Sequence, residues 1–262
     1  MEAEQGSSRR GVLRTAVAGA LGAGLTATAG AGGWAPAVAA EAKAAGTGGV
    51  QVAVLLYDGF TALDAVGPYE VLCRVPEVRV TMVAQEAGPV RTDTGELQLV
   101  AESAMRDVRT ADVLLVPGGG QRGTVAMMED VGVQDWIRRI HRHTTWTTSV
   151  CTGSLILGSA GLLRGLPATT YWASRPYLEQ LGATYTLGRF VETGKIITAA
   201  GVSAGIDMGL HLAARLSTEK VAQAMQLAVE YDPDPPYDTG SPEKAGAETE
   251  ALALKLLADA AR

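Results

Sequence analysis

The chain of 262 residues contains only two cysteines, Cys73 and Cys151, and only three histidines. Two cysteines are too few for a disulfide framework, and no spacing of cysteine and histidine matches that of a zinc site. We therefore expect no structural metal site, and each thiol has to be interpreted on its own.

The chain also lacks clusters of basic residues. Its 22 lysines and arginines are outnumbered by 28 aspartates and glutamates, which gives a formal net charge of -6. A nucleic-acid-binding surface requires clustered lysine and arginine to neutralise phosphates. The composition therefore argues against a nucleic-acid partner and favours a small-molecule substrate.

Large apolar side chains are scarce in the N-terminal region, where alanine and glycine dominate residues 16–33. Such a run is too weakly hydrophobic to anchor a protein in a bilayer. It follows the pair Arg9 and Arg10 and precedes the small residues Ala37–Ala39, an order typical of a twin-arginine export signal with its cleavage site. We expect residues 1–40 to be removed and the mature protein to be secreted or periplasmic, without a membrane anchor. The alternative is an alanine-rich tail with a chance arginine pair.

Residues 48–262 alternate short apolar runs with segments of helical periodicity. With 47% hydrophobic residues and 32 glycines, the chain can bury a large core. The run Val50–Tyr57 is continuously apolar, as expected for a strand buried on both faces. Alternating strands and helices predict a single α/β domain of the flavodoxin-like type, with a mostly parallel sheet covered on both faces. A proline-rich stretch over 232–242 precedes a C-terminal helix.

Further strands are expected at 79–84, 113–116 and 147–150, helices at 64–75, 133–141 and 153–163, and continued alternation through 171–181, 195–199, 204–216 and 218–230.

The segment Thr147–Ser154 places Cys151 between an apolar strand and a helical pattern. This is the form of a nucleophile elbow, in which a sharp turn raises the side chain above the carboxyl edge of the sheet, where ligands bind in open α/β folds. Gly153 allows the backbone to pass closely, and the unpaired N–H groups of the following helix favour the thiolate. We therefore predict that Cys151 is a nucleophile. The alternative is a small buried packing residue.

None of the three histidines is a convincing base for this thiol. His141 and His143 lie among arginines at a helix end and are expected to be solvated. His211 belongs to an apolar helix, where a packing role is expected, and Cys73 is interpreted in the same way. A thiolate activated by histidine is therefore disfavoured.

Carboxylates are better candidates to assist Cys151. Asp64 follows the first strand at the same edge of the sheet, so the two side chains could meet there. An N-cap of the helix that contains Pro68 is an equally good interpretation of Asp64. Glu70 lies further into that helix and is the weaker candidate.

Several motifs now resemble one known family, the DJ-1/PfpI proteins, and within it the isonitrile hydratase branch. They are LDAVGPYE at 63–70, VPGG at 116–119, SVCTGS at 149–154, AGLLRG at 160–165, ATT at 168–170, GID at 205–207 and EYDP at 230–233. The resemblance covers about residues 50–245, nearly the whole mature chain.

The resemblance implies that Cys151 is the nucleophile, that Asp64 is the adjacent acid/base, and that Thr152 lies in the same pocket. The backbone of Gly118 and Gly119 would line the other side. The resemblance implies a homodimer. It implies no metal and no organic cofactor.

Two positions refine the expected activity. Tyr171 stands where many relatives have histidine, so its part in substrate binding is specific to this sequence. Peptidase-like members have histidine directly after the cysteine, and Thr152 in that place lowers the protease interpretation. The implied reaction is hydration of isonitriles to N-substituted formamides. Glyoxalase or deglycase chemistry on carbonyls, and a thiol or ligand sensor like the sensor domain of AraC-type regulators, remain alternatives.

Overall fold

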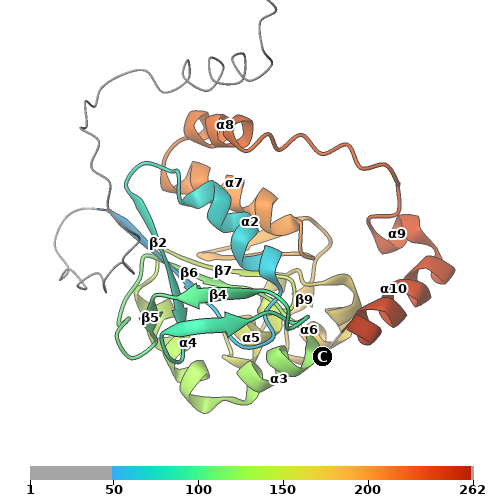
Figure 1. Cartoon of the computed structure of the whole chain (residues 1–262), viewed down its shortest axis with the longest axis horizontal. Helices are drawn as coiled ribbons and strands as arrows, with labels where there is room; N and C mark the ends of the chain where they lie inside the picture. The colour runs from blue at the N-terminus through green and yellow to red at the C-terminus, as the bar shows by residue number, and fades with distance from the viewer. Residues whose placement is uncertain (1–48, 261–262) are drawn as a thin grey trace, which may run out of the picture. The chain divides into compact units, whose positions relative to one another are not determined.

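The computed structural model describes residues 49–260 (Figure 1). The export signal predicted for residues 1–40 lies outside the described residues. The strands are β1 (Val50–Leu55), β2 (Val78–Ala84), β3 (Gly88–Arg91), β4 (Gln98–Ala101), β5 (Ser103–Ala104), β6 (Val113–Val116), β7 (Trp146–Val150), β8 (Pro167–Ala168), β9 (Thr184–Tyr185), β10 (Phe190–Thr193) and β11 (Ile196–Ala199). The helices are α2 (Ala62–Leu72), α3 (Gln121–Glu129), α4 (Val131–His143), α5 (Gly153–Ser159), η1 (Trp172–Ser174), α6 (Arg175–Gln180), α7 (Ala204–Leu216), α8 (Glu219–Ala228), α9 (Pro242–Ala245) and α10 (Ala247–Ala260).

The centre of the fold is a seven-stranded sheet with the strand order β10-β11-β7-β6-β1-β2-β5. All neighbours pair in parallel except β10 and β11, which pair antiparallel. Every residue of β6 is buried, because this central strand is covered on both faces. The expected α/β, flavodoxin-like fold with a mostly parallel sheet is confirmed.

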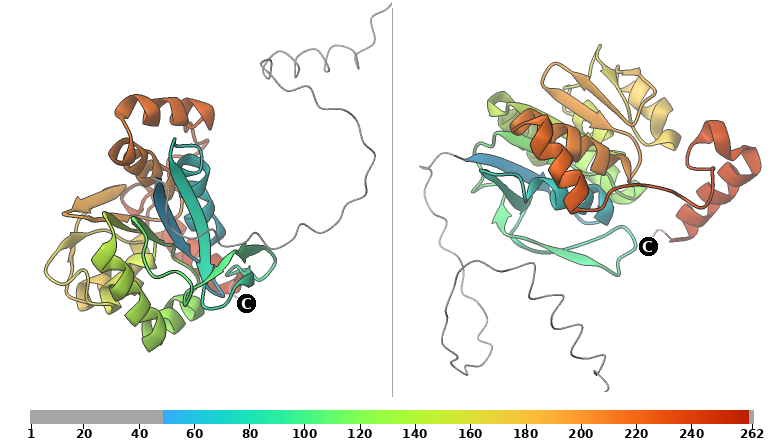
Figure 2. Two further views of the ribbon diagram at one scale, coloured as in Figure 1. Left: turned by 90° about the vertical axis from the view of Figure 1, so that its left-hand side faces the viewer. Right: turned by 90° about the horizontal axis from the view of Figure 1, so that it is seen from above.

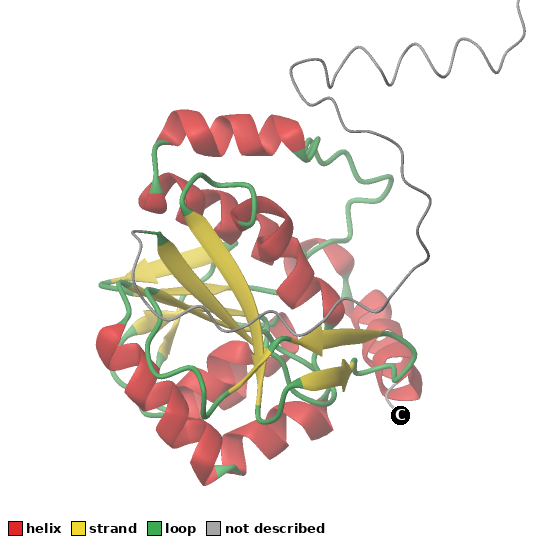
Figure 3. Cartoon of the chain, turned by 60° about the vertical axis from the view of Figure 1, so that its left-hand side comes forward, coloured by secondary structure: helices red, strands yellow, loops and turns green. Residues whose placement is uncertain are grey.

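Helices cover both faces of this sheet. α2, α7 and α8 pack together on one face, and α3, α4 and α5 on the other, which can be followed in two directions of view (Figures 1 and 2). The hairpin β3–β4 is a separate two-stranded sheet at the end of the large one (Figure 3). Right-handed crossovers between parallel strands place the helices in this way, and they leave the carboxyl ends of the strands at one edge.

Most element predictions are correct, including the strand at 113–116. The helix expected over 153–163 is shorter, because α5 ends at Ser159 and Gly161 follows with a φ of 80°, in the left-handed region that terminates helices. The strands β3, β4, β5, β8, β9 and β10 and the helix α3 were not predicted. These strands are short, and periodicity alone does not indicate two-to-four-residue strands.

The C-terminal helix α10 follows the proline-rich stretch, as expected, and contacts α9. None of its residues is buried, and four of its leucines are about half exposed. Within residues 49–260, no helix is both long and apolar enough to cross a membrane.

Candidate active site

Three neighbouring strands end at the predicted site. The sheet order places β6 between β7 and β1, and Cys151 directly follows β7. Gly118 comes two residues after β6, and Asp64 lies in the first turn of α2, the helix that follows β1. The parallel arrangement therefore brings together residues that are far apart in the sequence.

Cys151 is held in a strained backbone conformation, with a φ of 57°. Its N–H donates to the carbonyl oxygens of Ala199 (3.1 Å) and Ala200 (2.8 Å). Its carbonyl accepts from the hydroxyls of Ser154 (3.0 Å) and Thr170 (3.2 Å). These four hydrogen bonds fix the backbone of the turn and therefore the position of the thiol. The residue is buried, with 5% of its surface exposed. The geometry is that of the predicted nucleophile elbow.

Asp64 is completely buried. The alternative interpretation of Asp64 as the N-cap of α2 is wrong. The N-cap of α2 is Thr61, and the Asp64 carboxyl instead points toward the end of β6, where Oδ2 accepts a hydrogen bond from the Gly118 N–H (2.9 Å). Oδ1 has no hydrogen-bond partner among residues 49–260. The Asp64 carboxyl and the Cys151 thiol are close enough for each to shift the pKa of the other. The structure thus unites the two residues that the sequence predicts to act together.

Burial controls the protonation of this pair. It raises the pKa of Asp64 from an ordinary value of 3.8 to about 7, while the Gly118 N–H and the thiol favour the carboxylate. Burial and the nearby Asp64 charge also raise the pKa of Cys151, and the backbone N–H groups of Thr152 and Val202 only partly oppose this. The N–H group at the helix start does favour the thiolate, as expected, but burial outweighs it.

The Pro117–Gly119 segment lies against both Thr152 and Asp64. A Cβ atom at Gly118 would lie 2.6 Å from the Thr152 nitrogen and 2.8 Å from Asp64 Oδ2, so only glycine fits there. Gly119 N–H donates to Thr152 Oγ1 (2.9 Å), and this hydroxyl also bonds with Thr124 (3.0 Å). Thr152 is thus beside the site as predicted, but its hydroxyl is occupied in holding the glycine segment.

Tyr171 is half-buried near the thiol. Burial raises its pKa, and the neighbouring charge of a Cys151 thiolate raises it further. Its ring lies 5.5 Å from that of Trp172, measured between ring centroids, and a Cβ at Gly201 would contact the ring at 3.1 Å. This position is compatible with the predicted substrate contact, which stays a prediction.

The histidines are engaged elsewhere. His141 Nδ1 forms a hydrogen bond with Thr147 Oγ1 (2.8 Å). Partial burial lowers the pKa of His141. The side chain was expected to be solvated, and the structure shows it only partly exposed. His143 is exposed. His211 is partly buried in α7, and its Nε2 lies 2.5 Å from Glu192 Oε2, which agrees with the expected packing role for a histidine whose ring nitrogen has a partner.

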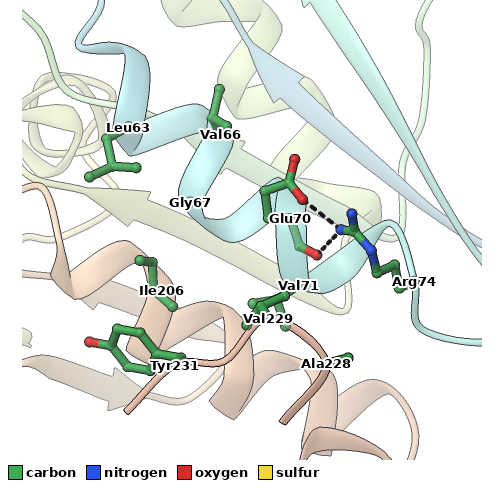
Figure 4. A pocket seen from close by; sticks show the side chains of 10 residues that line it. All are labelled: Leu63, Val66, Gly67, Glu70, Val71, Arg74, Ile206, Ala228, Val229 and Tyr231. Atoms are coloured by element: carbon green, nitrogen blue, oxygen red, sulfur yellow. Dashed lines mark hydrogen bonds and ion pairs between the residues drawn. The ribbon is translucent and has the colours of Figure 1, made fainter. Parts of the chain in front are cut away.

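Glu70 and Cys73 lie on the outer side of α2. Glu70 pairs with Arg74 (2.7 Å), and both line a mostly apolar cavity of about 370 Å³ between α2, α7 and the end of α8 (Figure 4). Neither Cys151 nor Asp64 lines this cavity. Cys73 is partly exposed, so it is less buried than the packing role predicted for it would require. Its sulfur lies 3.3 Å from an Arg74 nitrogen. Both thiols are free.

Three residues near the site were not found from the sequence. Tyr57 is buried directly after β1, Thr124 lies in the first turn of α3, and Asp93 raises the pKa of Asp64 through its charge. A signal existed only for Tyr57, which follows a strand at the same edge of the sheet. Within residues 49–260, no three His, Cys, Asp or Glu side chains are grouped so that they could hold a metal ion.

Comparison with known proteins agrees with this geometry. The sequence profile of the DJ-1/PfpI family matches residues 50–215. The chain belongs to the DJ-1/PfpI family. It is 44% identical to the isonitrile hydratase of Pseudomonas putida over 196 residues, which covers 75% of this chain and 85% of that protein.

Other relatives of this DJ-1/PfpI protein differ in role. The HTH-type transcriptional regulator CdhR of Pseudomonas aeruginosa is 31% identical over 185 residues, which is 67% of this chain and 52% of the regulator. Among solved structures, a ThiJ/PfpI family protein from Pseudomonas syringae has a TM-score of 0.76 and 38% identity, covering 81% of this chain and 87% of that chain. Drosophila melanogaster DJ-1beta, at 22% identity, has a TM-score of 0.64 over 70% of this chain and 98% of that one, and shares the fold.

Proposed function

We propose that this protein hydrates isonitriles to N-substituted formamides, with Cys151 as nucleophile and Asp64 as acid/base. The observation that carries the proposal is the completely buried Asp64 carboxyl, held by the Gly118 N–H beside a cysteine on a nucleophile elbow, with its pKa raised to about 7. A carboxyl that titrates near neutral pH can both accept and donate a proton. The 44% identity to an isonitrile hydratase supports this choice of substrate.

The first half of the reaction forms a covalent adduct. Asp64 takes the proton of the Cys151 thiol, and the thiolate attacks the terminal carbon of the isonitrile, forming a C–S bond. The Asp64 carboxylic acid then protonates that carbon, which gives a thioimidate on Cys151. A polarisable thiolate suits this soft carbon electrophile.

The second half releases the product. The Asp64 carboxylate removes a proton from water while the oxygen adds to the thioimidate carbon, and the resulting carboxylic acid returns this proton to the nitrogen. Collapse of the tetrahedral adduct breaks the C–S bond, and Asp64 transfers the proton of the adduct's hydroxyl to the departing sulfur, which leaves the formamide and the Cys151 thiol. One water is consumed for each isonitrile, so no oxidant or reductant is needed.

The test is turnover of a simple isonitrile, such as cyclohexyl isocyanide, by residues 41–262. Formamide production that is lost in Cys151→Ala supports the proposal, with Cys73→Ser as a matched thiol control that keeps activity. If Cys151 is rapidly alkylated but no formamide appears, the hydratase proposal fails.

Asp64→Asn tests the acid/base role separately. An amide cannot exchange the proton, so we expect this variant to bind the isonitrile but to lose most turnover, by roughly 10²- to 10⁴-fold. Equal kcat in the variant and the wild type would remove Asp64 from the mechanism.

A thiol or ligand sensor is the second candidate function. It is favoured by the similarity to the transcriptional regulator CdhR, which is 31% identical over 185 residues. Fast alkylation of Cys151 without turnover of isonitriles or of glyoxal-type carbonyls would support it.

A further inference from the structure

Tyr57 lies just after β1 and is not part of the proposed chemistry. Its side chain is only 3% exposed, and its hydroxyl donates a hydrogen bond to the Pro117 carbonyl oxygen (3.0 Å). Burial raises the pKa of Tyr57 well above its ordinary value, so the hydroxyl keeps its proton and remains a donor. A buried tyrosine hydroxyl that binds a backbone carbonyl beside a reactive centre calls for a functional explanation.

The carbonyl that accepts from Tyr57 belongs to the same peptide unit as the N–H that binds Asp64. The Pro117 C=O and the Gly118 N–H lie on opposite sides of one planar peptide, and the Gly118 N–H donates to Asp64 Oδ2 (2.9 Å). We propose that Tyr57 is a positioning residue that sets the acid/base strength of Asp64 through this peptide.

Two physical effects connect the hydroxyl to the carboxylate. The bond to the carbonyl fixes the rotation of the peptide plane, and therefore the direction of the N–H. It also polarises the peptide, so the N–H becomes a stronger donor, an effect of about 10–30% per bond in a chain of hydrogen bonds. Both effects favour the carboxylate form of Asp64.

Other groups around Asp64 remain in place when Tyr57 is changed. Cys151 follows β7, and Asp93 follows β3 and accepts a hydrogen bond from the Thr61 hydroxyl (2.6 Å). Gly118 is also held from its other side, since its carbonyl accepts from the Thr61 N–H (2.9 Å). Loss of the Tyr57 hydroxyl should therefore weaken one hydrogen-bond chain without displacing the charged groups.

The test compares Tyr57→Phe with the wild type in the full chain carrying Cys73→Ser, so that only Cys151 reacts. The pH dependence of the rate at which iodoacetamide alkylates Cys151 reports the coupled titration of the Cys151 thiol and the Asp64 carboxyl. The infrared carboxylic-acid band that disappears in Asp64→Asn reports Asp64 itself. Tyr231→Phe is the matched control, because it removes a tyrosine hydroxyl bound to Asp207 (3.2 Å) rather than to the site.

We expect Tyr57→Phe to move the titration of Asp64 upward by roughly half a pH unit, and Tyr231→Phe to leave it unchanged. Replacement of Tyr57 by 3-fluorotyrosine, a stronger donor of similar size, should move it downward. This second variant also decides the question if Tyr57→Phe fails to fold. Unchanged titration in a folded Tyr57 variant overturns the proposal.

This inference rests on the proposed function only in assigning Asp64 as the acid/base. Alkylation and infrared titration need no isonitrile, so they remain decisive if the hydratase activity is absent. Conversely, formamide production with an unshifted titration would leave the hydratase proposal intact and remove the role of Tyr57.

Discussion

At the scale of single residues, the site depends on a carboxyl and a thiol that are both buried. Burial makes each group harder to ionise than the same group in water. A proton can nevertheless pass from the thiol to the carboxylate and back. The strained φ of Cys151 and the single N–H bond to Asp64 Oδ2 keep the two groups facing each other. The proposed reactivity of Cys151 therefore depends on Asp64 as well as on the N–H group at the start of the helix that follows the cysteine.

The raised pKa of Asp64 predicts how stability varies with pH. The folded protein holds the Asp64 proton more tightly than the unfolded chain, so this stabilisation is complete below about pH 4 and is lost as the pH rises through 7. The slope is up to about 1.4 kcal/mol per pH unit for one group. Urea unfolding at several pH values should show that Asp64→Asn loses less stability than the wild type across this range. Parallel curves for the two proteins would contradict the prediction, and Asp135→Asn, at an exposed aspartate, serves as the control.

At the scale of elements, close backbone contacts allow three strand ends to share one site. A Cβ at Gly153 would lie 2.1 Å from the Val116 carbonyl oxygen, and one at Gly118 would meet both Thr152 and Asp64. These glycines let α5 begin directly against the end of β6. Their importance follows from the contact between elements and not from local turn geometry.

Gly118→Ala should push the glycine segment away from Thr152 and Asp64. We expect a loss of stability of about 1–3 kcal/mol and a larger relative loss of Cys151 alkylation rate and turnover, because the Gly118 N–H no longer reaches Asp64. Gly240→Ala is the control, since a Cβ there would meet nothing within 4 Å. Equal effects of the two substitutions on alkylation would show that the close contact at Gly118 is unimportant.

At the scale of the whole molecule, assembly and export stay predictions. The exposed leucines of α10 form the kind of apolar surface that proteins commonly use in contacts with other chains. The family resemblance implies a homodimer. The oligomeric state and the fate of the leader can each be measured directly.

We predict that residues 41–262 form a homodimer in solution. Size-exclusion chromatography with light scattering should give twice the mass of one chain at micromolar concentration. A single-chain mass that does not change with concentration would refute the prediction.

We also predict export of the full chain by the twin-arginine route. Arg9→Lys combined with Arg10→Lys should retain the uncleaved precursor in the cytoplasm, because that route recognises the arginine pair. Mass spectrometry of the exported wild type should find an N-terminus near residue 40. Export of the double variant at the wild-type level would disprove this route.

The sequence by itself determined the strand-turn-helix around Cys151, the parallel sheet and the position of Asp64 at the same edge, because each follows from local patterns and from the rule that parallel strands end together. Only the tertiary structure decided that Asp64 binds Gly118 rather than capping α2, that burial raises the pKa of the thiol, and that Tyr57 contacts the Pro117 carbonyl. Those features depend on desolvation and on distances between segments more than 30 residues apart, and hydrophobic periodicity carries no information about either.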